Sequence, residues 1–411
     1  MADPDPPSGR GPSRNYSSWR WFCRHMAEAE GPPLGDDAGT GSAVPAQDLG
    51  ARRRRARRRL TTALGPLPQS VPLNVELLDS VDCGPYRRDH IVYDSERWMS
   101  VPAYLLVPHE RAASGRPGPA LLAQHGHGAG KDEVCGLAGG DEGSEANDYA
   151  HQLALRGYVV LAPDLRTFGE RADWEPPNIY ACDHTYMYAS MLGHQLLALD
   201  LWDLARGLDL LCAHPLVDRR RVGMVGLSQG GTCTLFLAAW DRRVRAAVVS
   251  GYLSRWDVCA TIGWNMCGSQ VLTGVARDLG HLELGALVAP RPLLVETGTE
   301  DGIFPVEAAR STMAALAQVY AGLGAAECLE HDVFEGGHRW HGERAYPFLA
   351  RWLGGAWGEA GNMTASHQAP LPSPPAAPLG ENLSTDQGTR RARLGISSLR
   401  WGSPGDLACD P

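Results

Sequence analysis

The sequence predicts an α/β protein whose central sheet is mostly parallel and is covered by helices on both faces. Pro119–His125 and Tyr158–Leu165 ("YVVLAPDL") are short apolar runs, which is typical of strands buried on both sides. Segments with the apolar spacing of helices alternate with such runs along the chain. This alternation favours parallel pairing, because each crossover helix returns the chain to the same end of the sheet. Of the 411 residues, 44% are hydrophobic, which is enough for a sizeable core.

The predicted elements follow one another in a regular order. Strands are expected at Arg88–Ser95, Met99–Pro108, Pro119–His125, Tyr158–Leu165, Arg221–Leu227, Val244–Gly251, Arg291–Thr297 and His331–Phe334. Helices are expected at Ala146–Gly157, Tyr188–His214, Gln229–Trp240, Pro305–Leu323 and Gly342–Trp357. Two long stretches, Arg166–Tyr186 and Tyr252–Leu287, interrupt this order, and excursions of that length often form lids or binding loops.

The two ends of the chain differ from the middle in composition. Residues 1–50 are rich in Pro, Gly, Asp and Ser and are expected to be poorly ordered, although Trp19–Phe22 ("WRWF") is an apolar island suited to docking. Residues 51–85 are expected to be a helical and extended lead-in to the α/β domain at 86–357, and residues 358–411 a disordered tail. The segment "ARRRRARRR" at 51–59 carries seven arginines. The solvated face of a surface helix is favoured there over a nucleic-acid-binding arm.

Charge and cysteine usage narrow the class of protein. The net charge of −9 does not favour nucleic acid as a partner. The ten cysteines form no CxxC pair and no zinc-ligand spacing, and the first residues lack the basic and apolar regions of a signal peptide. No apolar run reaches the ~18 residues of a membrane helix. We therefore expect reduced thiols in a cytoplasmic protein without a membrane partner, and the oligomeric state is left open.

A glycine-flanked serine marks a candidate nucleophile. In "GLSQGG", Ser228 lies between Gly226 and Gly230, at the junction of a predicted strand and a predicted helix. A nucleophile at such a junction needs a sharp turn that lifts its hydroxyl above the sheet, and the turn needs small neighbours at positions −2 and +2. The structural alternative is a serine that merely fits a tight turn. The strand before and the helix after favour the nucleophile.

A serine hydroxyl is a weak nucleophile, so a base and an acid must follow it in the sequence. His338 in "FEGGHRWH" lies in a glycine-rich loop between the last predicted strand and the last predicted helix, and His341 is its competitor. Asp301 in "ETGTEDGIFP" follows the strand at 291–297, and its turn favours it over Glu300 and over Asp332 as the acid that orients the histidine.

Backbone N–H groups for an oxyanion hole are expected in two places. One belongs to Gln229, directly after the serine, and the other to His127 in the segment "HGHGAG" that follows the strand at 119–125. A metal site on the H-x-H pair is the competing interpretation, with Asp132 and Glu133 as further ligands. The pattern lacks a completed ligand set, so no metal is predicted there.

Together these motifs resemble the α/β-hydrolase superfamily. "MSVPAYLLVP" and "YVVLAPDLRTFGER" resemble its dienelactone hydrolase and acetyl xylan esterase-like branch, over about residues 70–357. The resemblance implies an eight-stranded sheet and a triad of Ser228, Asp301 and His338. Dienelactone hydrolases proper use a cysteine nucleophile, so the serine here favours ordinary carboxylic esters over dienelactone.

The expected function is that of a serine hydrolase, of carboxylesterase or acetyl esterase type, that cleaves small carboxylic esters through an acyl-enzyme and without a cofactor. A peptidase related to prolyl oligopeptidases is less favoured, because no long repeat region precedes the domain. A non-catalytic binding protein of the same fold is the other alternative.

Aromatic residues in the two excursions are equally suited to line a pocket or to form a local core: Trp174, Tyr180, Tyr186, Tyr188, Tyr252, Trp256 and Trp264. Arg166 and Arg171 are expected to make structural ion pairs rather than to bind a substrate carboxylate.

Overall fold

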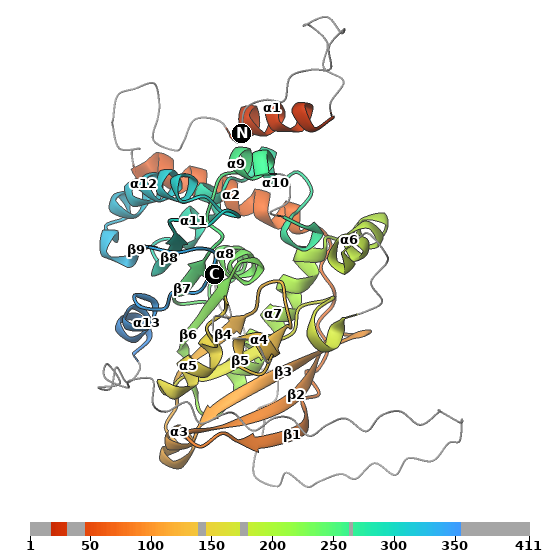
Figure 1. Ribbon diagram of the computed structural model, residues 1–411, viewed down its shortest axis with the longest axis vertical. Helices are drawn as coiled ribbons and strands as arrows, with labels where there is room; N and C mark the ends of the chain where they lie inside the picture. The colour runs from red at the N-terminus through yellow and green to blue at the C-terminus, as the bar shows by residue number, and fades with distance from the viewer. Residues whose placement is uncertain (1–17, 31–45, 139–144, 173–179, 263–265, 355–411) are drawn as a thin grey trace, which may run out of the picture.

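A single mixed sheet forms the centre of the computed structural model, which describes residues 18–30, 46–138, 145–172, 180–262 and 266–354 (Figure 1). Its strands are β1 Glu76–Asp82, β2 Tyr86–Glu96, β3 Met99–Pro108, β4 Gly118–Gln124, β5 Val159–Pro163, β6 Val217–Leu227, β7 Ala247–Ser250, β8 Leu293–Gly298 and β9 Leu329–Phe334. The longer helices are α1 Ser18–Glu30, α2 Ala46–Leu64, α6 Ala181–Met191, α7 Leu196–Ala213, α8 Gln229–Trp240, α11 His281–Val288, α12 Val306–Gly322 and α13 Ala345–Leu353. The shorter ones are α3 His109–Ser114, α4 Lys131–Val134, α5 Tyr149–Leu155, α9 Trp256–Ile262, α10 Val275–Asp278, η1 Gly169–Arg171, η2 Gly268–Gln270 and η3 Ala326–Cys328.

The strands are ordered β1-β2-β3-β5-β4-β6-β7-β8-β9. The run from β5 to β9 is parallel, as predicted, whereas β1, β2 and β3 form an antiparallel edge that joins β5. The sheet thus has nine strands rather than eight. The prediction missed β1, because its residues are largely exposed on both faces and show no alternation of apolar and polar side chains.

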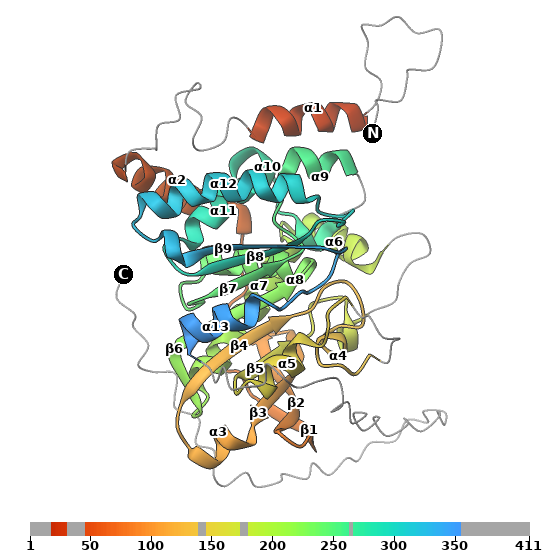
Figure 2. The same cartoon turned by 60° about the vertical axis from the view of Figure 1, so that its left-hand side comes forward.

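Helices cover both faces of the sheet, as predicted (Figure 2). On one face, side chains such as Met224 and Val249 pack against α7, α8, α11 and α12. On the other face, Val225 and Val248 belong to a second cluster with α5 and α13. Successive residues of one strand thus enter opposite cores, which requires the continuous apolar runs seen in the sequence.

The predicted long helix at Tyr188–His214 is in fact two helices, α6 and α7. The chain turns at Gly193, whose φ of 78° lies in the left-handed region that favours glycine. The N–H groups of Gly193 and His194 donate to carbonyls at the end of α6. A left-handed glycine of this kind ends a helix, and apolar spacing alone does not reveal it.

Part of the N-terminal segment that was expected to be poorly ordered is helical. Residues 18–30 form α1, which lies over α9 and α10 (Figures 1 and 2), and α2 begins at residue 46. In α2, the apolar residues Leu49, Ala56, Leu60 and Leu64 are buried on one face, whereas most of the arginines are exposed. The predicted tail at 358–411 lies outside the described residues.

Within the described ranges, none of the helices has both the length and the apolar character that crossing a membrane would require.

Candidate active site

Ser228 occupies a strained turn between β6 and α8. Its backbone has φ 60° and ψ −119°, in a region that non-glycine residues rarely adopt. A Cβ atom on Gly226 would lie 2.3 Å from the carbonyl oxygen of Gly230, and one on Gly230 would lie 2.0 Å from that of Gln124. Both flanking positions therefore require glycine, which is the physical basis of the motif.

The "HGHGAG" loop passes directly beside this serine. A Cβ atom on Gly126 would lie 3.2 Å from the Cβ of Ser228 and 3.9 Å from its Oγ. His125 fixes the start of the loop: its Nε2 accepts the N–H of Leu165 at 3.0 Å, and its Nδ1 lies 2.7 Å from the carbonyl oxygen of Gly126. Burial lowers the pKa of His125, which favours the neutral ring that this arrangement needs.

His338 and Asp301 form a buried pair. Nδ1 of His338 lies 2.8 Å from Oδ2 of Asp301, and their side chains are only 7% and 1% exposed. The other oxygen, Oδ1, accepts the N–H groups of Ile303 at 2.8 Å and Phe304 at 2.9 Å. The carboxylate is thereby locked, and it keeps the proton of the imidazole on Nδ1, which leaves Nε2 able to act as a base.

The histidine lies beside the end of β7, which also binds the backbone of the serine. The N–H of Ser228 donates to the carbonyl of Ser250 at 2.9 Å, and a Cβ on the next residue, Gly251, would lie 2.9 Å from Cε1 of His338. Nε2 of His338 is buried and has no hydrogen-bond partner among the described residues. The structure thus brings Asp301 and His338 together, and it does not form a hydrogen bond from Ser228 to the ring. Such bonds often tighten only with substrate bound.

The competing candidates have other partners. Nδ1 of His341 lies 2.7 Å from Asp332 Oδ2, and its ring stacks on Phe334 at 4.4 Å between centroids. Glu300 is exposed, and its backbone N–H donates to the carbonyl of Gly336. The second histidine therefore has an acid of its own on β9.

The two predicted oxyanion donors belong to the two segments next to the serine. Gln229 is the first residue of α8, where N–H groups have no carbonyl partner inside the helix. Its side-chain amide is buried without a partner among the described residues. His127 belongs to the loop beside the serine, and its exposed ring contacts Cys267, at 3.1 Å between Nε2 and Sγ.

Two buried residues that the sequence analysis missed hold the histidine loop. Glu296 on β8 accepts the N–H of Gly342 at 2.8 Å and that of His341 at 3.3 Å, and burial raises its pKa to about 7. Trp340 is fully buried, lies 4.6 Å from the Tyr149 ring between centroids, and donates its backbone N–H to the carbonyl of Glu145. The sequence signal that could have identified Glu296 is its position as a lone acidic residue inside the apolar strand "PLLVETG".

The arginines of the first excursion are structural, as expected. Arg166 and Arg171 both contact the buried Asp203, at 2.9 Å and 2.7 Å, and Arg166 also contacts Glu96 at 2.8 Å. Of the aromatic residues that were equally suited to a pocket or to a local core, Tyr252 and Trp256 belong to the core. Tyr180 and Tyr188 are exposed, and Tyr186 is half-buried. Trp174 and Trp264 lie outside the described residues.

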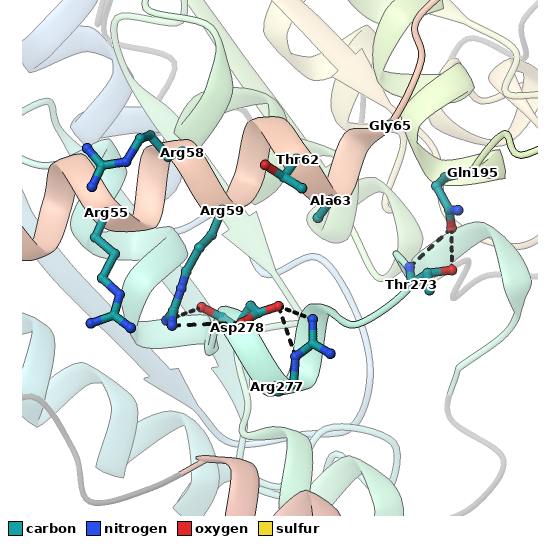
Figure 3. A pocket seen from close by; sticks show the side chains of 10 residues that line it. All are labelled: Arg55, Arg58, Arg59, Thr62, Ala63, Gly65, Gln195, Thr273, Arg277 and Asp278. Carbon is teal, nitrogen blue, oxygen red and sulfur yellow. Dashed lines mark hydrogen bonds and ion pairs between the residues drawn. The ribbon is translucent and has the colours of Figure 1, made fainter.

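A cavity of about 490 Å³ lies between α2 and α10 (Figure 3). Arg59 and Arg277 both pair with Asp278 there. Its lining is Arg55, Arg58, Arg59, Thr62, Ala63, Gly65, Gln195, Thr273, Arg277 and Asp278. None of these is a predicted site residue, so this cavity belongs to another part of the surface.

Comparison with known sequences places the serine turn in a recognised domain. The Dienelactone hydrolase family model matches residues 132–256, a segment that includes Ser228 and ends before Asp301 and His338. YtaP from Bacillus subtilis (strain 168), whose name assigns it to the hydrolases without a substrate, is 28% identical over 318 residues. That match spans 73% of this chain and all of YtaP.

Solved structures share the fold at low sequence identity. A Bacteroides fragilis protein assigned as an acetyl xylan esterase has a TM-score of 0.65 at 17% identity, covering 80% of this chain and 84% of its own. A glucuronoyl esterase from Solibacter usitatus has a TM-score of 0.56 at 18% identity, covering 79% and 97%. Together with the family match, these likenesses confirm the predicted fold class and the predicted resemblance.

Proposed function

We propose that this chain, an α/β-hydrolase with a segment of the dienelactone hydrolase family, is a serine hydrolase that cleaves carboxylic esters. The observation that carries the proposal is the buried Asp301–His338 pair, whose histidine lies beside Gly251, the residue after the Ser250 carbonyl that accepts the N–H of the strained Ser228. Nε2 of His338 has no hydrogen-bond partner among the described residues, so it is available to take a proton from a serine hydroxyl.

In the first half of the reaction, Ser228 Oγ attacks the carbonyl carbon of the ester while Nε2 of His338 takes the hydroxyl proton. Asp301 stabilises the imidazolium that forms. The negative charge on the carbonyl oxygen is stabilised by backbone N–H groups, for which Gln229 and His127 are the proposed donors. Collapse of the intermediate expels the alcohol, which takes the proton from His338 and leaves an acyl group on the serine.

In the second half, water takes the place of the alcohol. His338 removes a proton from the water as it attacks the acyl-enzyme, and it returns that proton to Ser228 as the acid leaves. The likeness to acetyl xylan and glucuronoyl esterases supports an ester substrate over a peptide. The reaction as proposed requires no cofactor.

The decisive experiment is Ser228→Ala, assayed with a short aryl ester and with a fluorophosphonate probe. Loss of the nucleophile is expected to lower kcat on the order of a millionfold and to abolish labelling. The matched control is Ser254→Ala, because Ser254 is also a buried serine and its Oγ has no hydrogen-bond partner among the described residues. This control should be labelled as fast as the wild type.

Three results distinguish the alternatives. Folded wild-type protein that is not labelled would support the non-catalytic binding role. Labelling at Ser228 together with cleavage of amino-acid anilides, but not of esters, would support the peptidase. Full esterase activity in Ser228→Ala would show that the nucleophile lies elsewhere.

A further inference from the structure

Three potential metal ligands from three separate segments converge next to the proposed oxyanion loop. His127 belongs to that loop, Cys182 to the first turn of α6, and Cys267 immediately precedes η2. Nε2 of His127 lies 3.1 Å from Sγ of Cys267 and 3.9 Å from Sγ of Cys182. All three ligand atoms lie within 4.8 Å of one another.

We propose that His127, Cys182 and Cys267 form a binding site for Zn²⁺. Tetrahedral zinc, with bonds of about 2.3 Å to sulfur and about 2.0 Å to nitrogen, places its ligand atoms about 3.5–3.8 Å apart. The observed separations bracket this range, so side-chain shifts of under an ångström would centre an ion. Two thiolates and an imidazole are a ligand set that prefers Zn²⁺ to oxygen-seeking cations such as Mg²⁺ or Ca²⁺.

The surroundings have the features of a prepared site. The carboxylate of Asp183 accepts the N–H of Gly268 at 2.7 Å, which ties together the two segments that carry the cysteines. The ring of Phe168 meets that of His127 edge-on, at 5.2 Å between centroids, and limits its rotation. Fixed outer contacts of this kind orient metal ligands.

The site also has a route for entry. Cys182 is buried and Cys267 half-buried, whereas His127 is exposed. An ion can therefore enter from the histidine side, and a water molecule can occupy the fourth position. Binding replaces the thiol protons, which pass to solvent, and the histidine binds in its neutral form.

Such an ion would connect both excursions of the chain to the loop beside the serine. It would also hold the backbone of His127, the proposed oxyanion donor. That consequence rests on the proposed function, whereas the metal site itself does not, and its test reads metal binding rather than ester hydrolysis.

The test uses the full chain, reduced and stripped of metal, and titrated with Co²⁺ as a spectroscopic substitute for Zn²⁺. We expect one equivalent to bind and to produce thiolate-to-cobalt charge-transfer absorption in the near ultraviolet, which Zn²⁺ then displaces. Cys267→Ser and Cys182→Ser should each weaken binding on the order of a hundredfold or more, because a ligand matters more than an outer contact. Circular dichroism checks that both variants fold, and His127→Ala provides a third variant that retains both thiols.

Cys212→Ser is the matched control, since Cys212 is a half-buried free cysteine outside the cluster, and it should keep the full cobalt signal. Two outcomes would overturn the proposal. One is wild-type protein that is folded and reduced and yet shows no charge-transfer band with Co²⁺. Absence of the band after reduction counts against the site also when Cys182 and Cys267 are found as a disulfide before reduction. The other is an undiminished band in all three variants of the cluster.

Discussion

At the scale of single residues, two histidines three positions apart have different partners. His338 contacts Asp301 after β8, and His341 contacts Asp332 on β9. Both pairs are short and largely buried, so neither distance nor burial alone separates them. The difference is the neighbourhood of Ser228, because Gly251, which follows the Ser250 carbonyl that accepts the N–H of Ser228, lies against the ring of His338.

We predict that His338→Ala lowers kcat/KM for a short aryl ester by on the order of 10⁴-fold or more, because the base is lost. His341→Ala should change kcat/KM by less than about tenfold, because the His341 ring has no role in the proposed proton transfers. Steady-state kinetics on both variants check the prediction. Equal losses in the two variants would reject the assignment of His338 as the base.

A second residue-scale prediction concerns Asp200. It is fully buried on α7, and one of its oxygens has no partner among the described residues. Burial raises its pKa to about 7. An acid whose pKa is raised by folding stabilises the fold below its ordinary pKa, and that contribution is lost as the pH rises through the folded value.

Between about pH 4 and pH 7, the unfolding free energy of the wild type should therefore fall by about 2–4 kcal/mol more than that of Asp200→Asn. Urea denaturation across these pH values measures it. Glu110→Gln, at an exposed position on α3, should leave the wild-type slope unchanged. A parallel pH profile for wild type and Asp200→Asn would show that Asp200 does not titrate there.

At the scale of elements, the turn between β6 and α8 depends on glycines at fixed distances from the backbone. Gly230→Ala would place a Cβ 2.0 Å from the carbonyl oxygen of Gln124. That oxygen belongs to strand β4, so the clash can be relieved only if the strand moves. We expect a loss of about 1–3 kcal/mol in stability together with reduced activity. Gly302→Ala is the control, because its Cβ would meet nothing within 4 Å.

Thermal unfolding and ester kinetics measure both variants of this pair. If Gly230→Ala is as stable and active as Gly302→Ala, the close approach of the backbone at the turn is not the reason why the motif requires glycine.

The elements also show how far sequence patterns reach. The parallel strands and α8 were predicted closely, because buried runs and their flanking turns are local signals. The break between α6 and α7 was missed, since one glycine conformation decides it. The edge strand β1 was missed because only its pairing with β2 makes it a strand.

At the scale of the whole molecule, the arginine-rich helix α2 is part of the folded domain. Nε of Arg53 donates to the carbonyl of Ala286 at 2.8 Å, and another of its nitrogens donates to that of Ala289. Burial lowers the pKa of Arg53. The arginine run therefore includes at least one residue that attaches the helix to α11.

We predict that Arg53→Ala lowers the unfolding free energy by about 1–3 kcal/mol, because buried carbonyls lose charged donors. Arg54→Ala, at the exposed neighbouring position, should change it by less than about 0.5 kcal/mol. Chemical denaturation of the two variants compares them directly. A neutral Arg53→Ala would mean that apolar contacts alone hold α2 in place.

The sequence by itself determined the parallel sheet, the glycine-flanked turn at Ser228 and a short list of histidines and acids that follow it. These depend on patterns within a few residues. Only the tertiary structure decided that His338 meets Asp301 and His341 meets Asp332, and that Glu296 lies beneath their loop. It also decided that His127 meets cysteines 55 and 140 residues away. The physical reason is that these contacts form between segments that are distant in the sequence and meet at the same edge of the sheet. A pattern of neighbouring residues carries no information about such contacts.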